Sequence, residues 1–139
     1  QYLIDNNYVD TVIQLPPDLF FGTTIATCIV VLKKSKHDNA TLFIDASGEF
    51  VRSGNKNKLL PEHRQKILDA YSGRKTIDHF ARLVENGDIA KNGYNIAVSS
   101  YVEQLDTRVA VNIKALNADI ARIVARQSEL RKQIDAIVA

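Results

Sequence analysis

Residues 9–34 constrain the fold of this chain more than any other stretch. They read VDTVIQLPPDLFFGTTIATCIVVLKK, and this pattern predicts a strand, a short loop and a second strand. The first strand, residues 9–15, ends at two prolines, which cannot donate ladder hydrogen bonds. The second, residues 24–32, is mostly β-branched and carries no charge. An apolar run without alternation is typical of a strand buried on both faces, so we expect a layered α/β sheet.

The residues after this hairpin predict short elements separated by turns. We expect a polar, basic surface loop at residues 51–58 and a helix that begins around Pro61 and ends at Gly73 in the left-handed conformation. The remaining segments are short strands at residues 41–45 and 80–84, one helical turn at residues 88–92 and an extended segment at residues 94–98. With 139 residues in all, the chain is long enough for one domain or a piece of one.

Composition excludes several classes of protein. The net charge of +2 is too small to indicate nucleic-acid binding on its own, and the longest apolar run is well short of the ~20 residues that cross a bilayer. The single cysteine, Cys28, excludes an internal disulfide and is expected to be a buried, inert thiol. A reducing compartment and the lack of a signal-peptide pattern predict a cytoplasmic protein that does not associate with a membrane.

No set of residues has catalytic or metal-binding spacing. The three histidines, His37, His63 and His79, lie far apart in the sequence, which argues against a metal site. The six glycines are scattered, so no glycine-rich loop could cradle a phosphate or a cofactor. No Ser-His-Asp or Cys-His arrangement is suggested either. We therefore expect neither a catalytic residue nor a metal in this chain.

The last thirty residues follow a different pattern. Apolar positions recur in alternating steps of four and three residues, with one polar position and no Gly or Pro between them. We call these positions the seam: Val109, Ile113, Leu116, Ile120, Ile123, Gln127, Leu130, Ile134 and Ile137. They predict a helix about 40 Å long at about 1.5 Å per residue. A 3.5-residue period favours pairing with a partner helix, and the alternative is an amphipathic helix that packs on its own domain.

Three stretches share a pattern that extends beyond secondary structure. They are LP at residues 15–16 with LF at 19–20 and TIATCIVVLK at 24–33, then LFIDAS at 42–47, then DIAKNGYNI at 88–96 with SYV at 100–102. In this order they resemble the late motif, the following strand and the closing segment of adenine-N6 DNA methyltransferases. The similarity is greatest to the modification subunit of type I restriction-modification systems, and it covers roughly residues 1–102.

This resemblance implies a fold and a division of the chain. Residues 1–102 would be the C-terminal segment of a methyltransferase-type, Rossmann-like α/β sheet with an antiparallel edge hairpin, and residues 103–139 would be a long helical tail. Family members bind S-adenosylmethionine at a glycine-containing loop and hold the target amino group with an Asn-Pro-Pro-aromatic motif. Both lie upstream of the hairpin in this family and neither occurs here, so the chain reads as an excised fragment. We expect it to be inactive alone, to bind no cofactor and to self-associate through uncovered sheet surface.

The resemblance also implies a role for the loop between the two strands. An enzyme that methylates adenine in a duplex flips the base out and stacks it on an aromatic ring. Matching positions to the family assigns this ring to Phe20, with Phe21 as the second candidate; the alternative is that Phe20 plugs the edge of the core. Candidates for contact with DNA phosphate are Lys33, Lys34, Arg52, Lys56 and Lys58, although for any one of them a solvated surface is the favoured interpretation.

The partners that the resemblance implies are DNA, a specificity subunit that reads the DNA sequence, and a nuclease subunit of the same system. The helical tail is the candidate for docking on the helices of the specificity subunit. Two other functions stay open on the sequence alone. One is a non-enzymatic interaction module built on the coiled-coil tail, and the other is a DNA-binding accessory domain.

Overall fold

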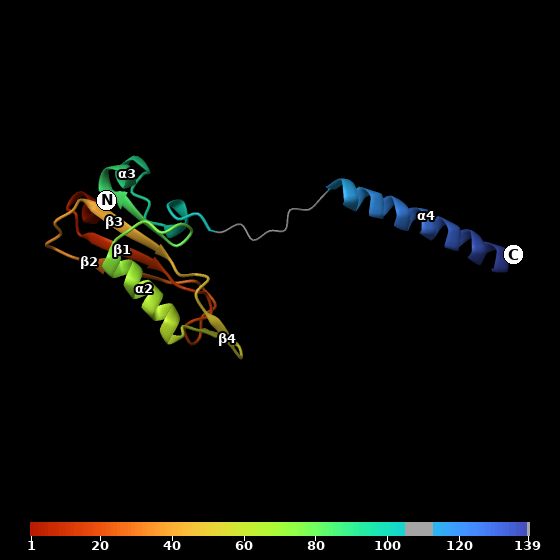
Figure 1. Ribbon diagram of the computed structural model, residues 1–139, viewed down its shortest axis with the longest axis horizontal. Coiled ribbons are helices and arrows are strands. Elements are labelled where there is room, and N and C mark those ends of the chain that lie inside the picture. Colours follow the sequence, from red (N-terminus) through yellow and green to blue (C-terminus); the bar gives the residue numbers. More distant parts are fainter. Residues whose placement is uncertain (105–112, 139) are drawn as a thin grey trace. The chain divides into compact units, whose positions relative to one another are not determined.

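The computed structural model describes residues 1–104 and 113–138 (Figure 1). The chain divides into two compact units, Gln1–Leu105 and Asp106–Ala139. The first unit contains α1 (Tyr2–Asp5), β1 (Val9–Gln14), β2 (Cys28–Leu32), β3 (Ala40–Asp45), β4 (Val51–Ser53), β5 (Lys56–Lys58), α2 (Pro61–Gly73), β6 (Ala81–Glu85), α3 (Asn86–Lys91) and a 3-10 helix, Val98–Ser100. The described part of the second unit is one helix, α4 (Ile113–Val138).

Four strands form a mixed sheet in the order β2-β1-β3-β6. β1 and β2 pair as an antiparallel hairpin in which Gln14 lies opposite Cys28, β1 and β3 run parallel, and β3 and β6 run antiparallel. The α/β class and the antiparallel edge hairpin are therefore confirmed. Because β1 and β3 are parallel, the residues that end them, Gln14 and Asp45, lie side by side at one edge. We call this edge the carboxyl edge of the sheet.

The two central strands are buried because both faces of the sheet are covered. On one face, Val12 and Phe43 belong to a cluster with Ile89 of α3. On the other face, Ile13 and Ile44 belong to a second cluster that α2 joins through its buried residue Ala70. Successive side chains of a strand point to opposite faces, so this division follows from the pleat. The core of the first unit thus consists of two apolar layers with the sheet between them.

β2 is an exposed edge strand, and the prediction that residues 24–32 form a strand buried on both faces is wrong. The strand begins only at Cys28, and Ile29, Val30 and Leu32 are exposed. Cys28 itself is exposed, which also overturns the expectation of a buried thiol. The residue types of β2 are those of a covered strand. They cannot show by themselves whether another element lies over them.

The predicted strands at residues 41–45 and 80–84, the helix up to Gly73 and the helical turn at residues 88–92 are confirmed to within two residues at each end. Residues 51–58, predicted as a loop, instead form the antiparallel β4–β5 hairpin, whose turn contains Gly54 at φ +60°. Residues 94–98, predicted as extended, form no strand: Tyr94 takes a positive φ of 59°, and Val98 opens the 3-10 helix.

The left-handed residue at the end of α2 is Arg74, at φ 43°, and not Gly73 as predicted. This conformation is unfavourable for a residue with a Cβ. The Arg74 guanidinium offsets that cost, because it lies 2.9 Å from Asp10 Oδ1 and 3.0 Å from Asp38 Oδ2 and donates a 3.2 Å hydrogen bond to the Ala40 carbonyl. A tertiary contact therefore decides which residue caps the helix.

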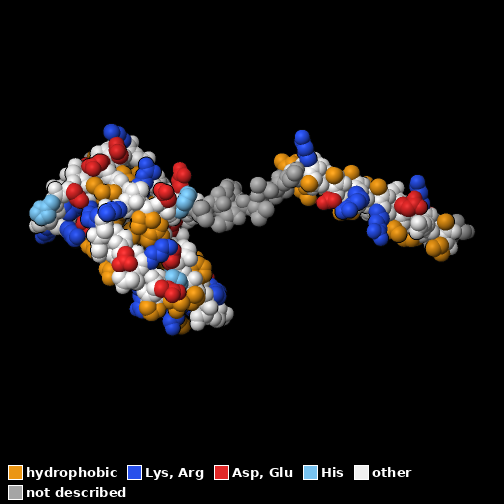
Figure 2. All heavy atoms as spheres, in the orientation of Figure 1, with side chains coloured by type: hydrophobic (Ala, Val, Ile, Leu, Met, Phe, Trp, Pro, Cys, Tyr) orange, Lys and Arg blue, Asp and Glu red, His pale blue; other side chains and the backbone are white. Residues whose placement is uncertain are grey.

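α4 confirms the helical tail. From Ile113 onward, all the seam positions are exposed, and Figure 2 shows hydrophobic side chains along the visible face of the helix. Val109, the first predicted seam position, lies outside the described residues. Among the helices described, none is long and apolar enough to cross a membrane.

Candidate functional site

The loop between β1 and β2 lies at the carboxyl edge of the sheet and presents two aromatic rings outward. Its base is held by Leu15, which is buried and donates a 2.8 Å hydrogen bond from its backbone to Thr27 O, and by Leu19, which packs against the α2 side of the core. Phe20 is 49% exposed and Phe21 is fully exposed. The loop therefore packs its leucines against the core and leaves its two phenylalanines exposed at this edge.

The β4–β5 hairpin braces this loop through main-chain and side-chain hydrogen bonds. Asn57, only 5% exposed, donates its backbone N–H to Asp18 O at 3.0 Å and its side-chain amide to Pro17 O at 2.8 Å. Arg52 forms a 3.0 Å ion pair with the Asp18 carboxylate. Lys56 Nζ donates to Phe20 O at 3.1 Å. The basic segment that the sequence predicted as a separate surface loop thus packs directly on the aromatic loop.

The five basic candidates do not lie together. Arg52, Lys56 and Lys58 belong to the hairpin at the carboxyl edge, whereas Lys33 and Lys34 follow β2 at the opposite end, where the Lys33 N–H donates to Tyr8 O. A strand of the length of β1 separates these ends by about 20 Å at about 3.3 Å per residue. The structure therefore divides the predicted basic set into two groups.

The amino end of the sheet carries a charged cluster that the sequence pattern did not predict. The Asp10 carboxylate is nearly inaccessible and lies 2.9 Å from Arg74 and 3.3 Å from Lys33 Nζ. A hydrogen bond with Tyr71, with Asp10 contributing, raises the pKa of Lys33. Lys36 lies beside them with its side chain buried, and burial lowers its pKa. In the sequence, this cluster is indicated only by Asp10, a charged residue among the β-branched residues of β1.

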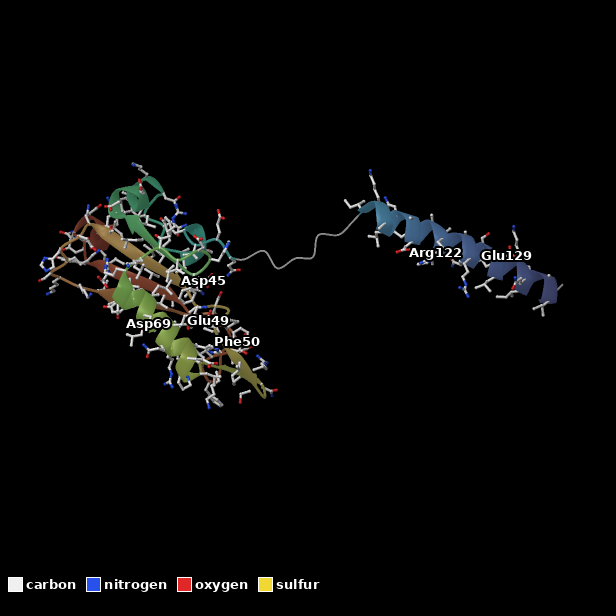
Figure 3. All side chains as sticks on the ribbon, viewed as in Figure 1. Asp45, Glu49, Phe50, Asp69, Arg122 and Glu129 are labelled. Carbon is white, nitrogen blue, oxygen red and sulfur yellow. The ribbon has the colours of Figure 1, made fainter. Side chains whose placement is uncertain are left out.

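A hollow of about 440 Å³ opens at the carboxyl end of β3, and Asp45, Glu49 and Gln104 in its lining are already paired. Asp45 Oδ1 accepts the Ser47 N–H at 2.9 Å, and Asp45 Oδ2 accepts the Gln104 amide at 3.0 Å. Glu49 forms an ion pair with Lys66. Figure 3 labels Asp45 at the end of β3 and Glu49 and Phe50 in the segment that follows it. These bonds fit a turn-closing role for Asp45.

The described residues bring together no cluster of metal-ligating side chains. No group of three or more His, Cys, Asp or Glu side chains lies close enough to hold an ion within residues 1–104 and 113–138. The six glycines are scattered along residues 22–93 and form no glycine-rich loop. No reaction step is therefore assigned to a cofactor held by this chain.

Comparison with known proteins identifies relatives along almost the whole chain. A family model described as N-6 DNA methylase matches residues 1–109. The type I restriction enzyme MpnII methylase subunit of Mycoplasma pneumoniae is 42% identical over 139 residues, covering 99% of this chain and 26% of the relative. The MjaVII methylase subunit of Methanocaldococcus jannaschii is 28% identical and covers 95% of this chain and 24% of the relative.

A solved structure of a type I methyltransferase subunit also matches this chain. The methyltransferase subunit of a type I restriction-modification system from Streptococcus thermophilus matches with a TM-score of 0.72 and 41% identity. The match covers 74% of this chain and 22% of that one. The chain thus spans about a quarter of the length of the curated relatives that it matches.

Proposed function

Because this chain belongs to the N-6 DNA methylase family, we propose that it forms part of the modification subunit of a type I restriction-modification system. The intact subunit would transfer a methyl group from S-adenosylmethionine to N6 of adenine in DNA, together with a specificity subunit and a nuclease subunit. The methylase segment would comprise residues 1–102, and residues 103–139 would serve assembly. Similarity to type I methylase subunits along nearly the full length of this chain supports this assignment.

The contribution of the first unit is the aromatic loop, which stacks on the flipped adenine. The observation that carries this proposal is the exposure of Phe20 and Phe21 on a loop whose leucines pack against the core. An aromatic ring that packs the core would be expected inside one of the two apolar clusters, and neither ring belongs to them. Stacking on such a ring is worth roughly 1–3 kcal/mol per base.

The loop proposal is tested in the full-length subunit assembled with its specificity subunit. DNA with 2-aminopurine at the target position reports base extrusion by its fluorescence. Phe20→Ala and Phe21→Ala are each compared with the unsubstituted complex, and we expect at least one to lose most of the fluorescence signal and lower kcat while cofactor binding is retained. If both keep the signal and kcat, the loop does not stack the base.

Two of the basic candidates are proposed as phosphate contacts on the basis of their exposure. Lys34 and Lys58 are exposed, whereas Lys33, Arg52 and Lys56 are already engaged by Asp10, Asp18 and loop carbonyls. Because each neutralised phosphate releases a counterion, removing one contact lowers the salt dependence of binding by about one unit of slope. Lys58→Met should therefore weaken DNA binding by the complex and reduce that slope.

The second unit is proposed to dock on the specificity subunit through the seam of α4. The support is that Ile120 and Ile123 are 51% and 62% exposed although they lie on a heptad-spaced apolar stripe. Replacing both with Asp should abolish co-purification with the specificity subunit. Replacing Ala121, which the heptad spacing places between seam positions, with Asp is the matched control and should leave assembly intact. Retained assembly of the Ile120→Asp, Ile123→Asp variant contradicts the docking proposal.

The chain alone is proposed to be catalytically inactive and prone to self-association. The family's Asn-Pro-Pro-aromatic motif and glycine-containing cofactor loop do not occur in its sequence, and β2 leaves an unpaired edge with exposed Ile29 and Val30. We expect no methyl transfer above background with labelled cofactor and DNA. Light scattering should show assemblies that Val30→Lys reduces. A monodisperse monomer of the unsubstituted chain at high concentration would contradict the second expectation.

A further inference from the structure

One ammonium group closes the turn that carries the tip of the aromatic loop. Lys56 Nζ lies 3.1 Å from Phe20 O and 3.3 Å from Thr23 O. These two carbonyls flank Phe21 and Gly22, and Gly22 has a φ of +78°, in the region that favours glycine. The two carbonyls would otherwise face water on either side of the most exposed ring in the loop. Lys56 therefore ties the two sides of the tip together.

The base of the loop is held by the same hairpin. Asn57 is buried and bonds both Pro17 O and Asp18 O, while Arg52 lies 3.0 Å from the Asp18 carboxylate and 3.1 Å from Asn57 Oδ1. Asp18 has a φ of +54°, a backbone conformation that residues other than glycine seldom take. These bonds hold the chain in that conformation just before the aromatic pair.

We propose that Lys56 and Asn57 are positioning residues: the β4–β5 hairpin is a clamp that sets the conformation of the aromatic loop. This inference rests on the proposed function, in which a ring of the loop stacks on the extruded adenine. A loop ordered before the base arrives does not lose conformational entropy at that step, so the clamp supports turnover more than DNA affinity. An ammonium whose protons already point at two carbonyls is also poorly placed to bind phosphate.

The first test measures order in the loop and needs no activity. Backbone ¹⁵N order parameters of Phe20, Phe21 and Gly22 are measured on the 139-residue chain, at a concentration below its self-association. We expect about 0.85, the value of rigid backbone, in the unsubstituted chain and below about 0.6 in Lys56→Met. Lys58→Met, which removes the same charge from the same hairpin, should leave the values unchanged. Order parameters that are unchanged in Lys56→Met overturn the clamp.

The second test separates a clamp from a phosphate contact in the full-length complex with 2-aminopurine DNA. Lys56→Met should lower kcat and the extrusion signal about tenfold and leave the salt slope of DNA binding unchanged. Lys56→Arg should recover part of kcat and part of the extrusion signal. Lys91→Met in α3 is the control and should behave as the unsubstituted complex does. A reduced salt slope with unchanged kcat would assign Lys56 to phosphate and overturn the proposal.

The two tests together distinguish failure of the clamp from failure of base stacking. If Phe20→Ala and Phe21→Ala both keep the extrusion signal while Lys56→Met disorders the loop, base stacking fails and the hairpin still clamps the loop. If a phenylalanine variant loses the signal and Lys56→Met leaves the loop ordered, base stacking stands and the clamp is refuted.

Discussion

Two lysines at opposite ends of the sheet make the same kind of bond in different surroundings. At the amino end, the side chain of Lys36 is 2% exposed and donates to the carbonyls of Val9 and Ala40 at 2.7 and 2.6 Å, which ties the first residues of β1 and β3 together. At the carboxyl edge, Lys56 is half-buried and donates to two carbonyls of an exposed loop. The first lysine joins strands of the core, and the second holds a surface loop.

This difference shows how one residue type can serve stability or function. Removing a donor from a buried site leaves acceptors that water cannot reach, so the whole protein loses stability. Removing it from an exposed loop lets water replace the bond, so the loss is one of local order. Substitutions at the amino end should therefore change the free energy of unfolding, whereas substitutions at the carboxyl edge should change the behaviour of the loop.

The largest effect is expected at Asp10, the buried carboxylate of the amino end. Asp10→Ala removes the buried carboxylate that pairs with Arg74 and Lys33, whose side chains are 24% and 46% exposed. We expect the free energy of unfolding to fall by about 2–3 kcal/mol, because hydrogen bonds of a buried carboxylate to charged donors are lost while both cations keep access to water and Arg74 keeps Asp38 as a partner. Urea unfolding followed by circular dichroism measures it.

A matched control for this substitution lies on the same guanidinium. Asp38 also pairs with Arg74, but its side chain is 48% exposed. Asp38→Ala should cost less than about 1 kcal/mol, as exposed pairs do. Equal losses for the two variants would mean that the amino end is no more dependent on buried charge than the rest of the surface.

Lys36→Met should have the next largest effect. The buried ammonium is lost, yet the Ala40 carbonyl keeps an N–H from Arg74 at 3.2 Å and the Val9 carbonyl lies 3.1 Å from the Thr41 hydroxyl. Because each acceptor retains a neighbouring donor, we expect a loss of about 1–2 kcal/mol in urea unfolding. A gain in stability would show that burying the charge costs more than its two hydrogen bonds contribute.

The pH dependence of Lys36 sharpens the same comparison. Burial lowers the pKa of Lys36 below 10.5, with Arg74 also lowering it and Asp38 opposing, so the unfolded chain binds this proton more tightly than the folded one. The contribution of Lys36 to the free energy of unfolding should therefore rise as the pH increases from the lowered folded pKa towards 10.5. Unfolding of the unsubstituted chain and of Lys36→Met at several alkaline pH values gives the difference. If the free energy of unfolding of the unsubstituted chain falls relative to that of Lys36→Met as the pH rises, the lowered pKa of Lys36 is contradicted.

The smallest change in stability is expected for Lys56→Met. Phe20 and its neighbours are exposed, so water can bond the freed carbonyls, and we expect a loss below about 0.5 kcal/mol. The same variant should nevertheless disorder the loop, as measured by its order parameters. A loss as large as that of Lys36→Met would remove the distinction between the two ends of the sheet.

The sequence predicted part of the β1–β2 hairpin, because strand-forming residues and terminating prolines are local signals. β1, β3 and α2 were found at nearly their observed bounds for that reason. The exposure of β2 was missed, because residue type does not report which neighbours are present. The β4–β5 hairpin was missed because bonds to residues about 35 positions away hold it, among them the bond from Arg52 of the hairpin to Asp18. The candidate ring at Phe20 came from a resemblance, whereas its bracing by Lys56 needed three dimensions.

By itself, the sequence determined the family, the α/β class, the antiparallel pairing of the first two strands and the helical character of the tail. These properties depend on patterns within a few tens of residues, where β-branching, proline and heptad spacing act through local geometry. Only the tertiary structure decided which strand lies at the edge, why Arg74 rather than Gly73 is left-handed, and which lysine binds carbonyls instead of facing solvent. Each of those outcomes depends on burial and on partners brought together from distant parts of the chain. The stability of each arrangement is therefore set by the surroundings of a residue and not by its type.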